Sequence, residues 1–130
     1  MKHNRGSTLV ESALALTSWS ILMAGIMELG FTGLISNSVS FAAQRAARYA
    51  SVRGRTSGHA ASTADIQSIA NQAATPISAG MLTVTVTWTP DNNPGSTVQV
   101  KVACSVKPAL LPLSATPLTL QSTAAQTVVQ

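Results

Sequence analysis

A long apolar stretch near the start of the chain, from Leu9 to Ile35, limits what this sequence can form. It consists mostly of Leu, Ile, Ala, Met, Gly and Phe, diluted by Ser and Thr. A helix of about twenty residues rises roughly 30 Å, which is enough to cross the hydrocarbon core of a bilayer. We therefore expect a transmembrane helix over about residues 9–35.

A cleaved secretory signal is the competing interpretation, because it also has a basic start and an apolar middle. The apolar region of such a signal is usually shorter and ends at a small-x-small site before a polar mature start. Here helix-forming sequence continues without a break through Phe41 to Val52. This continuity favours a permanent helix over a removed signal.

Small and apolar residues recur at three- and four-residue spacings after Ile35, which predicts one more helical face: Val39, Ala42, Ala43, Ala46 and Ala50. One helix over residues 7–52 would be roughly 70 Å long, twice what a membrane needs. We expect its outer half to pack on something outside the bilayer.

The rest of the chain predicts a short helix and a sheet. The capping pattern from Ser62 to Asp65 opens a helix over Thr63 to Ala74. After Gly80 the apolar period becomes two, and the turn-rich segment 90–96 separates two alternating runs: Leu82, Val84, Val86 and Trp88, then Val98, Val100, Val102, Cys104 and Val106.

These runs predict a β-hairpin with one apolar face, and the tail from Leu118 to Val129 is a weaker candidate for a third strand. An apolar connector interrupted by prolines precedes that tail, and it contains Leu110, Leu111 and Leu113. A hairpin alone is marginally stable in water, so we expect the outer half of the long helix to cover it. Cys104, the single cysteine, is interpreted as a buried small hydrophobic residue.

The predicted fold class is thus α+β, a long N-terminal membrane-spanning helix packed on a small antiparallel sheet, with a short second helix. The expected organisation is a leader over residues 1–6, the long helix over 7–52, a linker and short helix over 53–80, and the sheet region over 81–130.

The segment from Gly6 to Glu11, at the start of the apolar stretch, is a candidate processing site. Four neutral residues separate the glycine from the glutamate. A carboxylate near the start of a membrane helix is costly and normally has a partner or a function. Cutting after Gly6 would remove Lys2 and Arg5 and create an ammonium on Ser7, near Glu11 on the helix surface. In an assembly, Glu11 could pair with the new amine of a neighbour. The alternative is a Glu11 at the headgroup level of an uncleaved anchor.

Glu28 follows Glu11 by seventeen residues, or roughly 25 Å of helix, which places it near the outer interface. Two interpretations of Glu28 are open: its carboxylate reaches the lipid headgroups, or it pairs with a specific partner. Arg45 and Arg48 begin a basic cluster that continues with Arg53 and Arg55. We interpret the cluster as solvated or headgroup-bound, with docking to an acidic partner as the alternative, and keep Glu28, Arg45 and Arg48 as candidate helix-packing residues.

The sequence offers no recognisable catalytic set. His3 and His59 stand apart, Asp65 fits a helix start, and Asp91 fits a turn. Metal-ligand spacing and a phosphate-binding loop are missing from the sequence, and five aromatic residues are few for nucleic-acid binding. We expect a non-catalytic protein with no cofactor, metal, nucleic acid or small-molecule substrate.

Three groups of residues together resemble the TadE-like pseudopilins of the tight-adherence (Tad/Flp) type IV pilus system. The resemblance covers about the first fifty residues, and its residues are Arg5, Gly6, Val10, Glu11, Ala13 and Leu14, then Gly25, Ile26, Glu28, Leu29 and Gly30, then Ala42, Ala43, Ala46, Ala47, Arg48, Tyr49 and Ala50.

The resemblance implies a minor pilin, inserted in the bacterial inner membrane with a cytoplasmic N-terminus and a periplasmic C-terminal domain. A prepilin peptidase would cut after Gly6, leaving Ser7 as the new N-terminus and Glu11 for processing or assembly with other pilin subunits and the assembly machinery. Ser7 and Ser12 depart from the bulky apolar and aromatic residues common there. The four arginines after the span also conflict with the positive-inside rule. The alternative is an uncleaved TadE/TadG-like anchor that recruits an envelope partner.

Overall fold

The computed structural model describes residues 5–75, 77–107 and 117–129. The leader residues 1–4 and most of the proline-interrupted connector, residues 108–116, lie outside the described part. The elements follow in the order α1 (Arg5–Ser51), α2 (Thr63–Ala73), the short 3-10 helix η1 (Ala79–Met81), β1 (Leu82–Thr89), β2 (Thr97–Val106) and β3 (Leu118–Thr127). The α+β class, with a long apolar N-terminal helix and an antiparallel sheet, is confirmed.

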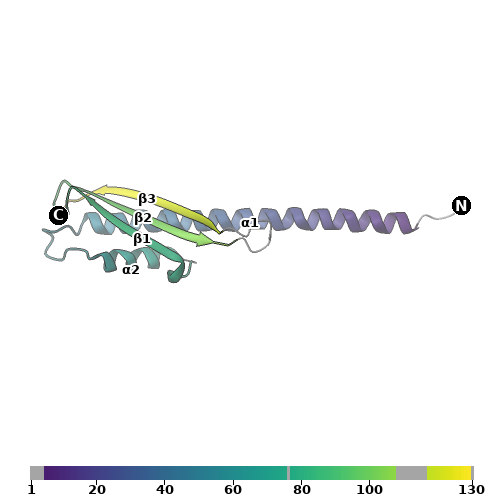
Figure 1. Cartoon of the computed structure of the whole chain (residues 1–130), viewed down its shortest axis with the longest axis horizontal. Helices are drawn as coiled ribbons and strands as arrows, with labels where there is room; N and C mark the ends of the chain where they lie inside the picture. The colour runs from purple at the N-terminus through teal and green to yellow at the C-terminus, as the bar shows by residue number, and fades with distance from the viewer. Residues whose placement is uncertain (1–4, 76, 108–116, 130) are drawn as a thin grey trace.

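Helix α1 runs through 47 residues without interruption and extends well beyond the other elements (Figure 1). It begins two residues earlier and ends one residue earlier than the expected range 7–52. None of residues 6–34 is buried, and residues 6–23 are all exposed. We call residues 6–34 the projecting half and residues 35–51 the packed half, and we call the packed half, α2 and the sheet together the head.

The three strands form one antiparallel sheet in the order β1-β2-β3. In its centre, Val100 of β2 lies opposite Val86 of β1 and Ala124 of β3. The hairpin of β1 and β2 is therefore confirmed, and the third strand forms over Leu118–Thr127, ending before Val129. The inner face of β2 is fully covered, with Val98, Val100, Val102 and Cys104 at 0–1% exposure.

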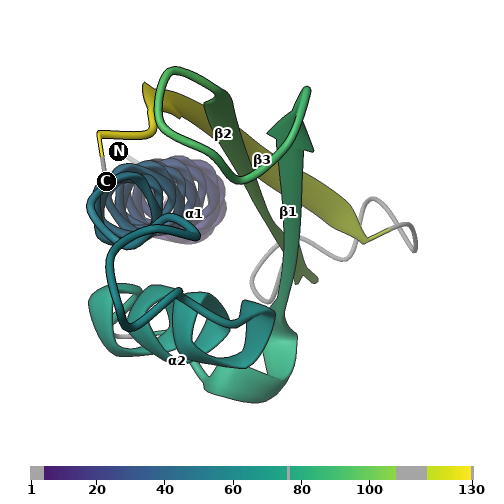
Figure 2. The ribbon, with the colours of Figure 1, turned by 90° about the vertical axis from the view of Figure 1, so that its left-hand side faces the viewer.

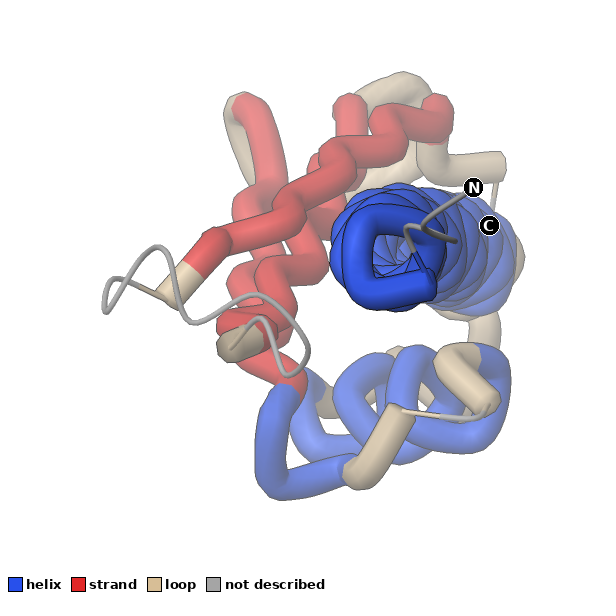
Figure 3. The backbone as a smooth tube through the Cα atoms, turned by 90° about the vertical axis from the view of Figure 1, so that its right-hand side faces the viewer, coloured by secondary structure: helices blue, strands red, loops and turns tan. Residues whose placement is uncertain are grey.

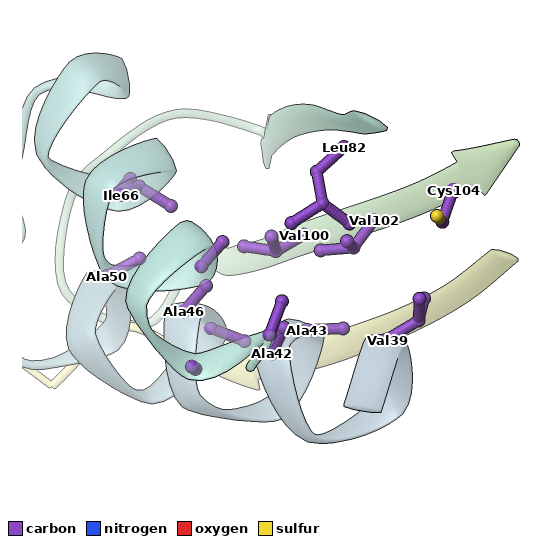
Figure 4. Packing of buried hydrophobic residues seen from close by; sticks show 14 of the residues in the cluster. Val39, Ala42, Ala43, Ala46, Ala50, Ile66, Leu82, Val100, Val102 and Cys104 are labelled. Atoms are coloured by element: carbon purple, nitrogen blue, oxygen red, sulfur yellow. The ribbon is translucent and has the colours of Figure 1, made fainter. Parts of the chain in front are cut away.

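The packed half of α1 covers this sheet through very small side chains. Figure 2, a view along α1, shows the sheet on one side of the helix and α2 on another, and Figure 3 shows the same arrangement from the opposite end. Five alanines of α1 have no exposed surface: Ala42, Ala43, Ala46, Ala47 and Ala50. Because alanine carries a single methyl group, the helix backbone can approach both layers closely. Figure 4 shows Ala42, Ala43 and Ala46 on the side of α1 toward Val100 and Val102, and Ala50 toward Ile66 of α2.

Helix α2 closes the core with Ile66 and Ala70, both fully buried. It begins with the expected capping box: the Ser62 hydroxyl accepts a hydrogen bond from the Asp65 backbone N–H at 3.1 Å, and the Asp65 carboxylate accepts one from the Ser62 backbone N–H at 3.1 Å. The helix ends at Ala73, one residue before the expected end, and the cap residue Ala74 donates its N–H to the Ala70 carbonyl.

Cys104 is buried at 1% exposure beside Leu82, so its expected role as a small core residue is confirmed. Burial raises the pKa of its thiol. A raised thiol pKa keeps the group protonated at neutral pH and lowers its reactivity.

The alanine contact should tolerate no enlargement. Replacing Ala46 by leucine inserts three carbon atoms at a fully buried position, and we expect a loss of about 1–3 kcal/mol in the free energy of unfolding. Denaturant unfolding of the full chain in detergent, followed by circular dichroism, would measure it. The control Gln44→Leu, at an exposed position of the same helix, should unfold like the parent chain. Equal stability of Ala46→Leu would show that the core has spare room.

Candidate processing and assembly site

The candidate processing residues lie in the first turns of α1, which begins at Arg5. Gly6, Ser7 and Glu11 are all exposed. Ser7 and Glu11 are four residues apart on one helix, so their side chains share a face. The Gly6–Ser7 peptide bond belongs to the first turn, where backbone N–H groups have no partner within the helix. Unwinding this turn therefore breaks fewer hydrogen bonds than unwinding a turn in the interior of α1.

The first turn of α1 contains no acidic residue that would complement the positive end of the helix dipole. Removing residues 1–6 would take away Lys2 and Arg5 and lower the side-chain charge from +4 (eight minus four) to +2 (six minus four). Glu11 would then be the acidic group closest along the chain to the new terminus.

Five hydroxyl groups of the projecting half are hydrogen-bonded within their own helix. Each donates to the backbone carbonyl four residues before it, over 2.6–2.9 Å, and the donors are Ser12, Thr17, Ser18, Ser20 and Thr32. A hydroxyl with such an internal partner can face lipid without an unsatisfied polar group. Together with its length and apolar composition, this makes α1 a candidate membrane span. These bonds were not predicted from the sequence, although serine and threonine in an apolar helix are their usual signal.

Glu28 lies on the projecting half just below the head. It is seven residues before Ile35, so it lies on nearly the same side of the helix as the buried face of the packed half. Its side chain is half-buried, and its carbonyl accepts the Thr32 hydroxyl. Glu11 and Glu28 are about 25 Å apart along the axis, so they form two separate sites.

The four arginines lie in two different places. Arg45 and Arg48 are exposed on α1. Arg53, in the loop after α1, lies over the Tyr49 ring at 4.5 Å from its centroid and donates a hydrogen bond of 2.7 Å to the Tyr49 hydroxyl. Arg55 donates its backbone N–H to the carbonyl of Asn92. Of these four arginines, Arg45 and Arg48 lie on α1, whereas Arg53 and Arg55 lie in the loop that follows it.

Phe41 is a surface feature that the sequence analysis missed. It is 55% exposed on the face of α1 that the head leaves uncovered. A hollow of about 410 Å³ lies on one side of it, between α1 and the end of α2, and is lined in part by Leu34, Ser38 and Thr75. A second hollow of about 260 Å³ lies on the other side, lined by Phe41, Gln44, Arg45 and Arg48. A large aromatic side chain between two hollows is suited to helix packing.

The far end of the head is held by Asp91, in the turn between β1 and β2. Its carboxylate accepts hydrogen bonds from the Ser96 hydroxyl at 2.6 Å and the Asn93 backbone N–H at 3.1 Å. These bonds, and more weakly the Arg55 charge, lower the pKa of Asp91. Gly95 adopts a φ of 90°, which favours glycine, and donates its N–H to the Val128 carbonyl. The turn is therefore tied to the end of β3.

Among the residues that the structure describes, no group of three or more His, Cys, Asp or Glu side chains is placed to hold a metal ion. Comparison with known proteins found no matching family model, no matching curated sequence and no matching solved structure.

The Asp91 turn predicts a pH-dependent stability. Its pKa is lowered in the folded chain, so the unfolded chain binds more protons as the pH falls below about 4. The contribution of Asp91 is complete above that range and is lost as the pH falls through the folded pKa. Thermal unfolding of the full chain in detergent should show Asp91→Asn less stable than the parent at pH 7, with a smaller difference at pH 3. A difference that stays constant with pH would contradict this role.

Proposed function

We propose that this chain is a minor pilin or pseudopilin of a Tad/Flp-type pilus, processed by a prepilin peptidase after Gly6 and required for assembly of the fibre. The observation that carries the proposal is the uncovered projecting half of α1, in which an 18-residue apolar window has no buried residue. Such a surface needs lipid or other helices around it. The chain acts by helix assembly and carries out no catalysis.

A rigid connection between the projecting half and the head supports this function. Because α1 is one uninterrupted helix, a force on the head is transmitted directly to the membrane segment. Apolar side chains gain little on moving from lipid to a bundle of similar helices, since both surroundings are equally apolar. The free-energy cost of moving α1 from a membrane to a fibre core then comes mainly from its charged groups.

The proposed cut acts on those groups. Lys2 and Arg5 hold an uncut helix at the cytoplasmic interface, because an ammonium or guanidinium group is costly to draw into hydrocarbon. The cut removes both charges and leaves the amine of Ser7 and the carboxylate of Glu11. Paired across two subunits in the fibre, these opposite charges compensate one another, whereas either alone would be strongly unfavourable.

We place the chain in the bacterial inner membrane with a cytoplasmic N-terminus and the head in the periplasm before assembly. Its partners are the prepilin peptidase, other pilin subunits and the assembly machinery. The long apolar helix supports membrane association. Orientation and partners follow from the proposed cut, since a cytoplasmic-side peptidase must reach Gly6.

Gly6→Ala should block processing without disturbing the helix. A Cβ at Gly6 would meet no atom within 4 Å, so alanine fits the folded chain and its effect would arise in the peptidase. Mass spectrometry of the protein from cells with an active prepilin peptidase should find Ser7 as the N-terminus of the parent and residues 1–6 retained in the variant. Gly30→Ala, equally unhindered in the same helix, is the matched control and should be processed normally. A parent chain that retains residues 1–6 would overturn the processing claim.

Glu11→Ala should leave membrane insertion intact and strongly reduce incorporation into fibres, because the amine of a neighbouring subunit loses its partner. The measurement is the ratio of this protein in sheared surface material to that in the membrane fraction. Ser18→Ala, at an exposed position of the same helix, should keep the parent ratio. Normal piliation with Glu11→Ala would remove the proposed role of Glu11. A parent protein found exclusively in membranes would favour the uncleaved anchor.

A further inference from the structure

A hollow of about 640 Å³ lies where the projecting half of α1 emerges from the head. We call it the base hollow. Its described lining comes from α1, from the segment before β1 and from the end of β2: Phe31, Ile35, Ile77, Ser78, Met81, Cys104, Ser105, Val106 and Lys107. Figure 1 shows β2 ending beside α1 on the side of the head that faces the projecting half. The base hollow therefore belongs to the end of the head nearest to the projecting half.

Apolar side chains make up most of the lining of the base hollow. The polar side chains in it supply two hydroxyl groups and one ammonium group, and they belong to Ser78, Ser105 and Lys107. Sites that enclose small molecules share this composition and have volumes of about 300–1,000 Å³. A ligand that matches the base hollow therefore has a long apolar part and an anionic group next to it.

The base hollow is level with a membrane surface. The expected span over residues 9–35 is about 40 Å long, which matches a bilayer together with its headgroup regions. Phe31 and Ile35 lie in the last five residues of this span. The base hollow is therefore beside the headgroups and the upper acyl chains of one leaflet.

The same end of the head carries exposed apolar side chains. Phe31 and Met81 are each 59% exposed, and Leu118, which pairs with Val106 across the sheet, is 47% exposed. The far end of the head has instead the polar turn around Asp91. Because contact with water is unfavourable for large apolar side chains, the end of the head with the base hollow is suited to a bilayer surface.

Charge favours an anionic lipid at this place. Residues 35–129 contain six Lys and Arg residues against two Asp and Glu residues, so the head is basic. Lys107 brings one of these positive charges to the base hollow. Basic groups near a membrane attract anionic lipids, whereas the phosphate of a zwitterionic lipid already has a cation in its own headgroup.

We propose that the base hollow holds one anionic phospholipid of the adjacent leaflet, with an acyl chain against Phe31 and Met81 and the phosphate beside the Lys107 ammonium. The bound lipid fixes the head against the membrane surface. This site goes beyond the proposed function, because it requires only that α1 spans a membrane and does not depend on the cut after Gly6 or on fibre assembly.

Photolabelling with a lipid tests the site. The full chain is reconstituted in phosphatidylcholine vesicles that contain phosphatidylglycerol with a diazirine on an acyl chain, irradiated, digested and mapped by mass spectrometry. We expect labels on residues 77–81 and 104–107 as well as on α1. Met81→Trp, a larger side chain at an exposed position of the lining, should remove most of the head label. Leu34→Trp, which lines the hollow of about 410 Å³ beside Phe41, should leave it unchanged.

The role of Lys107 is tested by comparing two lipids. The same diazirine is placed on phosphatidylglycerol or on phosphatidylcholine, and the ratio of the two labels is measured on residues 104–107. Lys107→Gln should lower this ratio about fivefold, the effect of one lysine near an anionic membrane surface. Lys101→Gln, at an exposed position of the same strand, should keep the parent ratio. An unchanged ratio in Lys107→Gln would contradict the phosphate contact.

The labelling pattern separates the lipid from other occupants. A labelled α1 with an unlabelled head would overturn the lipid site and leave the membrane span intact, whereas an unlabelled α1 would overturn the span itself. Head label that appears only after residues 108–116 are replaced by a Gly/Ser linker would assign the base hollow to this connector. Head label that appears only at low protein-to-lipid ratios would assign it to a second copy of the chain, and either result overturns the proposal.

Discussion

The close approach of α1 to the sheet is the contact on which the rest of the structure depends. Five buried alanines bring the helix backbone against the inner face of β2, and the same stripe admits α2 on the neighbouring side. A three-stranded sheet of this size has too small an apolar face to be stable alone. Because the helix that covers it continues beyond the head, stability of the head and display of the projecting half depend on one continuous element.

The strong periodic patterns in the sequence were sufficient to predict most of the fold. Alternation at period two predicted β1 and β2, and the Ser62–Asp65 pattern predicted the start of α2, because both signals arise from local geometry. The third strand was a weaker prediction since its inner face carries Ser122 and Ala124, which give little apolar contrast. The exposure of Phe41 could not be predicted, because it depends on which side of α1 the head covers.

The candidate site, like the fold, was predicted from the sequence only where local geometry determines it. Ser7 and Glu11 are four residues apart, so helix geometry alone predicts that they share a face. The four arginines are also close in sequence, yet the end of α1 at Ser51 separates two helix-face charges from two loop residues, one of which lies on Tyr49.

The internal hydrogen bonds of the serine and threonine hydroxyls give the projecting half a further property. Each hydroxyl already has an acceptor on its own helix, so contact with an acyl chain leaves it satisfied. A hydroxyl oxygen also keeps acceptor capacity toward a neighbouring helix, and rotation about a single bond can redirect its proton. The same surface of α1 is thus compatible with acyl chains and with a neighbouring helix, and neither requires a change in its backbone.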